Sequence, residues 1–409
     1  MRILFISADL PTRRDLRPYG MISALASRGH QVTVVCAAPP GSQQHEADLR
    51  ARGAAVVAVR QGPAERRQNM LRALLGPMPL QAAAAASPQL LEAVGAAARS
   101  GAYDVAHVDG IAASALGHAL AGLPAVLDAG GCASRALAQR ARAGWRHGAL
   151  AAIELGRTRR YEAAYLDRYK RVFAASADDA WALRLLGGPA HAPQTIHVVP
   201  TPIIIDHAVG PPTLREQGDL LVCAEADGYA AAVEELLSAA MPIIWGQRAE
   251  IRLLLAGPPP ARLAQHSAAD PRILSVSADD LRASARATIA LAPGGGTTAA
   301  NHALQAMARG APLVASPQIG RALRAVAGRD LLVADGPVEL ARAVLDLLDD
   351  PRYRGQIGRA GRDYAERTHS PEVVTNELAQ IYAAACGAAI AGWRLDVGLS
   401  SLLSPTLGA

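Results

Sequence analysis

Residues 289–298 carry the strongest local signal in the chain and read Ile289-Ala290-Leu291-Ala292-Pro293-Gly294-Gly295-Gly296-Thr297-Thr298. An apolar strand ends at the proline, and we expect a helix from about residue 299 to residue 309, where Gly310 closes it. Residues 312–316 then form another apolar strand. Strand, glycine-rich turn, helix and strand in this order predict a parallel β/α unit.

The glycine run allows two interpretations. In the first, the backbone of Gly294, Gly295 and Gly296 approaches a phosphate closely, and the N-terminus of the helix binds it. Thr297 and Thr298 then add hydroxyl donors. In the second, the segment is a tight turn with a threonine N-cap and binds no ligand. Three consecutive glycines exceed what a cap requires, so we favour the phosphate site.

The same β/α rhythm extends over most of the chain. Before residue 200 we expect strands at residues 2–7, 31–36, 54–59, 104–108, 124–128, 171–175 and 196–199. A break rich in proline follows at residues 200–212, and further strands are expected at residues 220–223, 252–256, 273–276, 287–291, 312–315 and 330–333. The sequence therefore predicts two doubly wound, Rossmann-like α/β halves. A ligand is expected at the carboxyl ends of the strands, in a cleft between the halves.

The composition excludes several classes of protein. The 409 residues are 51% hydrophobic with a net charge of +5, which is too apolar and too weakly charged for a disordered chain. Aromatic residues make up 4% and most basic residues are dispersed, so binding of nucleic acid by base stacking is not expected. Lys170 is the only lysine, and we attribute the excess of arginine and alanine to GC-rich codons.

The cysteines and the apolar runs indicate the cellular compartment in which the protein is expected. The four cysteines are far apart and form no CxxC pair, which argues against a zinc site and a disulfide framework and fits a reducing cytoplasm. The apolar run at residues 1–7 is too short for a signal sequence. No run of about 20 apolar residues occurs, so no membrane-spanning helix is expected.

Several motifs occur in order along the chain. One, at residues 304–315, begins Leu304-Gln305-Ala306-Met307-Ala308. The others are Arg28-Gly29-His30, Asp104-Val105-Ala106-His107-Val108, the helix at residues 154–162 before Ser176-Ala177-Asp178-Asp179, and residues 196–200, 361–364 and 370–371. Together they resemble glycosyltransferase family 4, whose members have the GT-B fold, and residues 304–315 resemble its donor-site motif. The resemblance covers about residues 1–385.

The resemblance implies a nucleotide-sugar as substrate, with no separate cofactor, and a glycan or lipid-linked acceptor. The donor would be held by Gly294, Gly295, Gly296, Thr297, Thr298, Asn301 and Gln305. The implied domains are an acceptor-side Rossmann-like domain at 1–200, a linker at 201–212, a nucleotide-sugar-side domain at 213–385, and a tail at 386–409 that packs partly on the first domain. The implied pathway is the synthesis of a polysaccharide, glycolipid or cell-envelope glycan.

The departures from the family are specific. Members carry two glutamates eight positions apart in the donor motif, and here these positions are Thr297 and Gln305. A glutamine still exchanges hydrogen bonds with a ribose hydroxyl, but without charge assistance. The family's Arg and Lys after the first strands of the second domain have no counterpart, because residues 224–229 hold no basic residue. In the turn after Asp128, the family's second acid is Gly131.

Catalytic and cationic groups are harder to assign. Asp109, just after His107 on the fourth expected strand, is the acceptor-side candidate. Arg14, with its neighbours Arg13 and Arg17, is a candidate cation for the leaving diphosphate, and the alternative is solvated loop charge. No metal is implied, because no Asp-x-Asp follows a strand.

The basic residues between Arg157 and Arg171 also allow two interpretations. They could contact anionic lipid head groups at the inner face of a membrane. The alternative, which we favour, is a solvated helix with ion pairs to Glu162 and Asp167.

Three functions are compatible with these observations. The first is a retaining, metal-independent glycosyltransferase of the cytoplasm. The second is a GT-B protein that has lost catalysis and serves as a binding or regulatory partner of an active glycosyltransferase, which the missing glutamates favour. The third, a sugar-nucleotide epimerase on the same fold, is disfavoured because its expected acidic residues are equally absent.

Overall fold

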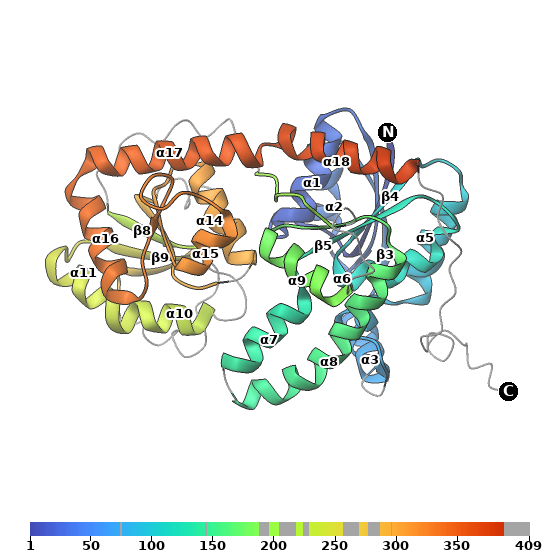
Figure 1. The fold of residues 1–409 in the computed structure, drawn as a ribbon, viewed down its shortest axis with the longest axis horizontal. Helices are drawn as coiled ribbons and strands as arrows, with labels where there is room; N and C mark the ends of the chain where they lie inside the picture. Colours follow the sequence, from blue (N-terminus) through green and yellow to red (C-terminus); the bar gives the residue numbers. More distant parts are fainter. Residues whose placement is uncertain are drawn as a thin grey trace. The chain divides into compact units, whose positions relative to one another are not determined.

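The structure, a computed structural model, describes residues 1–73, 76–143, 145–187, 196–203, 218–223, 229–256, 270–276, 287–295 and 297–387. Within these ranges, the side chains of residues 72–73, 139–143, 145–151, 229–230, 256 and 297–298 are not described. The chain divides into two compact units (Figure 1). The first comprises residues 1–200 and 374–409, and the second comprises residues 201–373.

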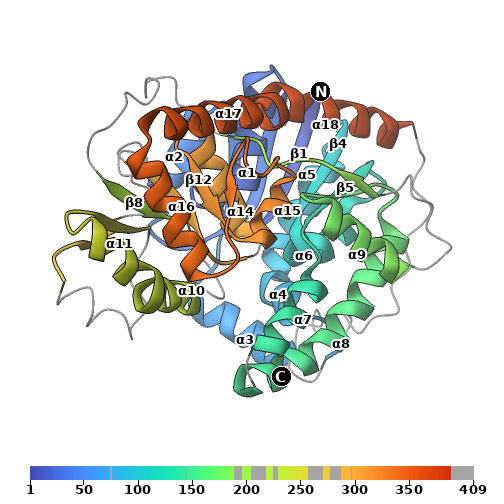
Figure 2. The ribbon, with the colours of Figure 1, turned by 60° about the vertical axis from the view of Figure 1, so that its left-hand side comes forward.

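The first unit is built on a seven-stranded sheet whose neighbouring strands all pair in parallel. The strand order is β3 (Ala54–Arg60), β2 (Gln31–Ala38), β1 (Arg2–Asp9), β4 (Val105–Asp109), β5 (Ala125–Gly130), β6 (Val172–Ala174) and β7 (Ile196–Val198). Figure 2 shows β1, β4 and β5 next to one another. Residues 3–8 of β1 are all buried, so both faces of this strand are covered, as its continuous apolar sequence predicts.

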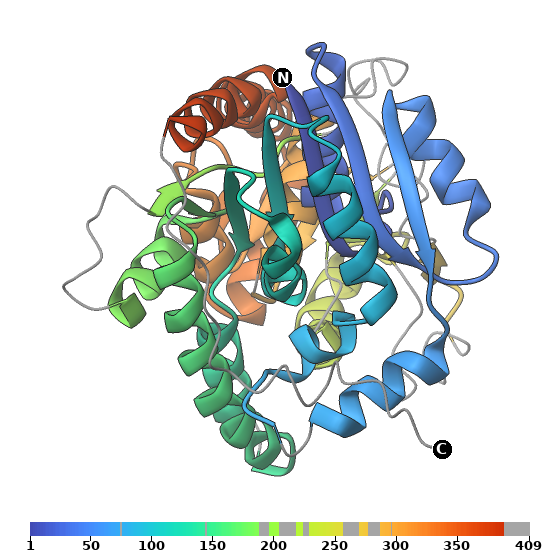
Figure 3. The same cartoon turned by 90° about the vertical axis from the view of Figure 1, so that its right-hand side faces the viewer.

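The helices of the first unit follow the strands in the expected alternation. They are α1 (Leu16–Ser27), α2 (Gln43–Ala51), α3 (Pro63–Ala73), α4 (Leu80–Ala85), α5 (Pro88–Arg99), α6 (Gly110–Ala113), a 3-10 helix (Ser114–Leu120), α7 (Ala133–Ala143), α8 (Trp145–Arg168) and α9 (Ala177–Gly187). The greater part of α18 (Pro371–Cys386) also belongs to this unit. The helices α7 and α8 pack along each other and extend away from the sheet (Figure 3).

Helix α1 contains a proline in its first turn, because it begins at Leu16 and so includes Arg17 and Pro18. Proline is tolerated in the first helical turn, where its missing N–H would have no partner within the helix. Gly29 follows the helix with φ +82°, a conformation that favours glycine.

The second unit is built on a six-stranded parallel sheet. Its order is β10 (Ile273–Val276), β9 (Arg252–Ala256), β8 (Asp219–Val222), β11 (Ile289–Ala292), β12 (Leu313–Ala315) and β13 (Leu332–Val333). Its helices are α10 (Tyr229–Glu235), a π-helical turn (Leu236–Ala240), α11 (Met241–Gln247), α14 (Thr297–Ala308), α15 (Pro317–Leu323), α16 (Pro337–Asp349) and α17 (Pro351–His369).

Helix α17 packs closely against the end of α14. A Cβ atom at Gly358 would overlap the carbonyl oxygen of Gly310, so α17 needs a glycine where it crosses the turn after α14. The helix is also capped: the Asp350 side chain accepts hydrogen bonds from the backbone N–H groups of Arg352 and Tyr353. This explains the pair Asp349-Asp350, which is a helix end followed by an N-cap.

The structure confirms the predicted fold class, two parallel α/β sheets with Rossmann-like strand order. The sequence missed α2, whose polar residues carry only a weak apolar face. It also overestimated β13, which spans Leu332–Val333 rather than residues 330–333. Most of the expected linker at 201–212, and the tail from residue 388, lie outside the described residues. No helix in the described part of the chain is long and apolar enough to cross a membrane.

Candidate functional site

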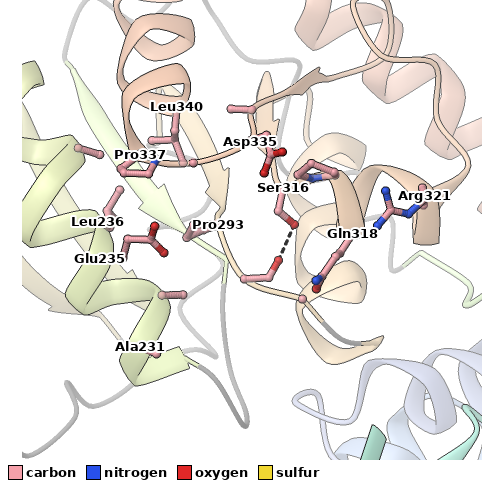
Figure 4. Close-up of a pocket in the computed structure, with 17 residues that line it drawn as sticks. Ala231, Glu235, Leu236, Pro293, Ser316, Gln318, Arg321, Asp335, Pro337 and Leu340 are labelled. Carbon is pink, nitrogen blue, oxygen red and sulfur yellow. Dashed lines mark hydrogen bonds between the residues drawn. The ribbon is translucent and has the colours of Figure 1, made fainter. Parts of the chain in front are cut away.

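A pocket of about 520 Å³ lies in the second unit, at the carboxyl ends of three neighbouring strands (Figure 4). Residues 293–295 follow β11, residues 316–318 follow β12, and residues 334–337 follow β13, and all of them line the pocket. The opposite wall comes from α10 and the π-helical turn after it. This is the edge of a parallel sheet where ligands bind in doubly wound folds.

Ser316 fixes the glycine turn at one side of this pocket. Its Oγ donates a hydrogen bond to the carbonyl oxygen of Gly294 at 2.6 Å, drawn dashed in Figure 4. The same oxygen accepts a hydrogen bond from the N–H of Ile319 and so caps α15. One side chain thereby ties the turn after β11 to the start of the helix after β12.

Gly295 packs closely against the end of the flexible Gln318 side chain, which would have to move if residue 295 carried a Cβ atom. A Cβ atom there would overlap Oε1 of Gln318 and lie 3.3 Å from its Cδ. Gly294 is less constrained, since a Cβ would make an ordinary contact with Ala232 at 3.6 Å. Gly295 therefore lets the Gln318 amide lie directly against the backbone at the pocket floor.

Besides Ser316, four polar side chains line the pocket over an apolar surface. Glu235 comes from α10, Asp335 from the turn before α16, and Gln318 and Arg321 from α15 (Figure 4). Apolar side chains of Leu236, Pro293, Pro337 and Leu340 lie between them. A guanidinium can bind a phosphate, carboxylates accept hydrogen bonds from hydroxyl groups, and apolar walls suit the flat face of a ring.

The predicted donor residues on α14 are only partly described. Gly296 and the side chains of Thr297 and Thr298 lie outside the described part of the chain. Asn301 is half-buried. Gln305 is 4% exposed, and its Nε2 has no hydrogen-bond partner among the described residues. A buried amide donor without a partner is costly, but neither Asn301 nor Gln305 is among the residues that line the pocket.

A second polar cluster lies in the first unit, at the carboxyl ends of β1, β4 and β5. Ser7 pairs with Asp109 in the strand register, and Asp109 pairs with Asp128. Ser7 Oγ donates a hydrogen bond to Asp109 Oδ2 at 2.9 Å. Asp128 is fully buried and accepts two hydrogen bonds from Nε of Arg17, at 2.8 and 3.0 Å, and one from the N–H of Gly130.

The two carboxyl groups of this cluster have different environments. Burial, followed by the negative charge of Asp128, raises the pKa of Asp109 from 3.8 to about 7. The hydrogen bond from Ser7 acts in the opposite direction and lowers the pKa of Asp109. The Arg17 guanidinium neutralises the charge of Asp128, and its Nη1 also binds the carbonyl oxygen of Val199. Asp109 is therefore a proton-exchanging carboxyl near neutral pH.

His107 is a core residue on β4. Its ring is fully buried and stacks on Phe5 with the ring centroids 4.3 Å apart. Its Nδ1 lies 2.7 Å from the hydroxyl of Tyr382, and its Nε2 lies 3.9 Å from Asp128 Oδ2. Burial lowers the pKa of His107 to about 4, so the ring is neutral at pH 7.

The arginines near the start of the chain are placed differently from one another. Arg17 lies in α1 and is buried against Asp128, so the expectation that it sits on a loop as a diphosphate cation is wrong. Arg13 is exposed and pairs with Asp48 at 2.6 Å. Arg14 is exposed in the turn before α1. Of the three, Arg14 remains the candidate.

One acidic residue that we expected to pair with the arginines of α8, Glu162, makes its hydrogen bonds elsewhere. Glu162 is fully buried and accepts hydrogen bonds from the N–H groups of Ala133 and Ser134, where it caps the start of α7. Arg157 instead lies 3.8 Å from Glu154, and Arg159 and Arg160 are exposed. Among the described residues, no group of three His, Cys, Asp or Glu side chains is arranged to hold a metal ion.

The sequence missed most of the pocket lining. Ser316, Gln318, Arg321 and Asp335 all follow the carboxyl ends of β12 and β13, and this position was the signal that could have identified them. Glu235 had no such signal, because its contribution depends on how α10 packs over the sheet. Ser7 was also missed, although it lies near the carboxyl end of β1.

The sequence matches two protein-family models. Residues 17–202 match the family described as glycosyl transferase 4-like domain, and residues 217–350 match the family described as glycosyl transferases group 1. No curated protein matches the chain.

Solved structures with similar folds support the same architecture. A sucrose-phosphate synthase (tll1590) from Thermosynechococcus elongatus has a TM-score of 0.65 at 17% identity, over 95% of this chain and 100% of that one. Anabaena Alr3699/HepE in complex with UDP-glucose has a TM-score of 0.65 at 13% identity, over 94% and 100%. A putative UDP-N-acetylglucosamine 2-epimerase from Listeria monocytogenes has a TM-score of 0.58 at 13% identity, over 93% and 95%. At these identities the likeness establishes a GT-B-like fold.

Proposed function

Because the chain carries a glycosyl transferase 4-like domain followed by a group 1 glycosyl transferase domain, we propose that it transfers a sugar from a nucleotide-sugar to a glycan or lipid-linked acceptor. The observation that supports this most is the pocket at β11, β12 and β13, which combines a fixed glycine turn with a guanidinium and two carboxylates. We expect retention of the anomeric configuration, no metal requirement, and a role in cell-envelope or exopolysaccharide synthesis in the cytoplasm.

We assign the diphosphate of the donor to residues 294–295 and to Arg321. Sugar transfer leaves negative charge on the departing diphosphate, and fixed N–H groups with a nearby cation stabilise that charge. Family members draw this cation from an Arg and a Lys after the first strands of the domain. Arg321 would supply it here from α15, on the other side of the glycine turn.

The remaining pocket groups suit a sugar. Glu235 and Asp335 can accept hydrogen bonds from sugar hydroxyls, and Leu236 and Pro337 can contact the apolar face of the ring. We assign the ribose to the Gln305 amide, whose Nε2 has no partner among the described residues. UDP-glucose is the ligand named for one structure with a similar fold, so it is the first donor to test.

On the acceptor side we assign Asp109 and, with Arg14, the exposed turn before α1. Arg159 and Arg160, which are exposed on α8, could contact an anionic membrane surface if the acceptor is lipid-linked, although a solvated helix is the interpretation that we favour.

Nucleotide binding tests the proposal directly. UDP, GDP and ADP, with UDP-glucose, GDP-mannose and ADP-glucose, would be titrated by calorimetry and thermal shift. Gly295→Val should weaken the preferred nucleotide at least about tenfold, because its side chain displaces Gln318 and fills the pocket floor. Gly246→Val is the matched control, since a Cβ at Gly246 meets nothing within 4 Å. The site assignment fails if Gly295→Val binds normally, and the function fails if the wild type binds no nucleotide.

The second candidate function is a GT-B protein that binds nucleotide-sugar or a partner without turnover. It is favoured by Thr297 and Gln305, which stand where family members have glutamates. Release of nucleoside diphosphate from a bound donor distinguishes the two. A donor that binds but is not cleaved, with or without an acceptor, would support the inactive protein.

A further inference from the structure

The pocket of the second unit contains charged side chains that are not paired with one another. Glu235, Asp335 and Arg321 all line it, and Figure 4 shows them on different sides of the cavity. Within the part of the chain that the structure describes, none of the three has an ion-pair partner. The pocket therefore offers two carboxylates and one guanidinium to a ligand.

Helix α10 brings Glu235 to the pocket because it passes directly beside the glycine turn. A Cβ atom at Gly294 would lie 3.6 Å from the Cβ of Ala232, which is on α10 about one turn before Glu235. After Glu235 the helix widens into the π-helical turn, where the N–H of Met241 bonds to the carbonyl oxygen of Leu236. Both of these side chains are buried in the core of the second unit. The turn is thus anchored, while the carboxylate of Glu235 stays exposed at the pocket wall.

Asp335 reaches the pocket from a segment whose backbone is also fixed. The N–H of Ala334 donates a hydrogen bond to the carbonyl oxygen of Ala315 at 2.9 Å, which ties the segment to β12. The N–H of Asp335 donates a hydrogen bond to Oε2 of Glu339 at 2.9 Å. This bond holds the Glu339 carboxylate next to Asp335, so it adds a third negative charge on the same side of the pocket.

The division of charge within the pocket has a consequence for the donor sugar. In the function proposed above, Arg321 is assigned to the diphosphate, so the charges left to face the sugar are those of Glu235 and Asp335. A neutral sugar can donate hydrogen bonds from its hydroxyl groups to both carboxylates. A sugar that carries its own carboxylate would instead bring a like charge close to two others. Repulsion of this kind is a means by which a protein excludes a competing ligand.

We propose that Glu235 and Asp335 make the pocket bind donors with an uncharged sugar and exclude donors whose sugar carries a carboxylate, such as a uronic acid. The inference rests on the function proposed above and adds to it the charge class of the donor sugar. It concerns binding alone and involves residues of the second unit only.

Calorimetry with matched donor pairs measures this selectivity. UDP-glucose and UDP-glucuronate differ only in the carboxylate that replaces the primary alcohol of the sugar. GDP-mannose with GDP-mannuronate, and ADP-glucose with ADP-glucuronate, are the equivalent pairs for the other two nucleotides. In the pair that the full-length protein prefers, the uronate should bind at least about tenfold more weakly than the neutral sugar. Because both carboxylates are exposed, this ratio should fall towards one as NaCl is raised from about 0.02 M to about 0.5 M.

Glu235→Gln and Asp335→Asn remove the two charges and preserve the shapes of the side chains. Each substitution should reduce the ratio of the two Kd values about threefold, and the double variant should bring the two values within about twofold of each other. Glu234→Gln is the matched control, because Glu234 is exposed on the same helix, loses the same charge, and does not line the pocket. It should leave the ratio unchanged.

The outcomes separate this inference from the proposed function. If the wild type binds the neutral donor and its uronate equally well, or the uronate more tightly, the selectivity is refuted and the proposed function stands. A ratio that persists in the double variant, or at high salt, would show that the uronate is excluded by its shape, and would refute the role of the two carboxylates. If the wild type binds no nucleotide-sugar of any pair, the proposed function fails and the selectivity fails with it.

Discussion

Asp128 and Arg17 show that the role of a residue in the structure can differ from the role that its sequence context indicates. In the sequence, Asp128 marks the end of a strand and Arg17 is part of a basic segment. In the structure they form a buried ion pair, with side chains 0% and 6% exposed. A buried pair of this kind is costly to break, because removing one partner leaves an uncompensated charge away from water.

Arg17→Met should therefore lower the free energy of unfolding by about 3–5 kcal/mol, measured by urea denaturation. The double variant Arg17→Met with Asp128→Asn should recover part of the loss, because no isolated charge remains. Arg14→Met, at an exposed position in the same segment, is the control and should change stability by less than about 0.5 kcal/mol. A loss in Arg17→Met no larger than that in Arg14→Met would contradict this account.

Gln305 gives a second prediction at the residue scale. Since its buried Nε2 has no partner among the described residues, Gln305→Met should leave stability unchanged or raise it by up to about 1 kcal/mol. The same variant should weaken nucleotide binding, because the proposed ribose contact is lost. Thermal denaturation and calorimetry would measure the two effects. A variant that is both unstable and normal in nucleotide binding would show that Gln305 serves the fold alone.

At the scale of elements, the residues at the starts of helices fix much of the local structure. The side chain of Ser316 caps α15 and also holds the glycine turn after β11, so a cap residue shapes the pocket. Asp350 caps α17, the helix that needs Gly358 in order to pack against the turn after α14. The caps are visible in sequence, because their effect is local, whereas the need for Gly358 depends on the packing of α17 against a distant turn.

Asp350→Ala should lower the free energy of unfolding by about 1 kcal/mol through loss of the two capping hydrogen bonds. Asp349→Ala is a close control, because the exposed Asp349 pairs with Arg248 only at the surface. That variant should cost less than about 0.5 kcal/mol. Both values come from chemical denaturation, and equal losses would argue against the cap.

At the scale of the whole molecule, the raised pKa of Asp109 links its local environment to global stability. The folded protein binds this proton more tightly than the unfolded chain, where the pKa is near 3.8. Unfolding free energy therefore falls as the pH rises from about 4 to about 7, and is constant above that range as far as Asp109 is concerned.

Asp109→Asn should remove this loss of stability at higher pH. The free energy of unfolding of the variant, relative to that of the wild type, should therefore increase by at least about 1 kcal/mol between pH 4 and pH 8. His107 titrates with the opposite sign, because burial lowers its pKa to about 4, but it does so in both proteins and cancels in the difference. Urea denaturation across this pH range measures the advantage. An advantage that is independent of pH would mean that Asp109 titrates normally.

The sequence by itself determined the two parallel α/β sheets, because apolar strands, glycine stops and proline breaks act over a few residues and repeat along the chain. It also identified the glycine turn and Asp109 as positions of interest. Only the tertiary structure decided their surroundings. The packing of α10, α15 and the turn before α16 around the ends of β11–β13 brought Glu235, Arg321 and Asp335 to one pocket, and burial set the different environments of Asp109 and Asp128. Burial, charge pairing and pocket shape depend on contacts between distant segments, and no local pattern in the sequence contains them.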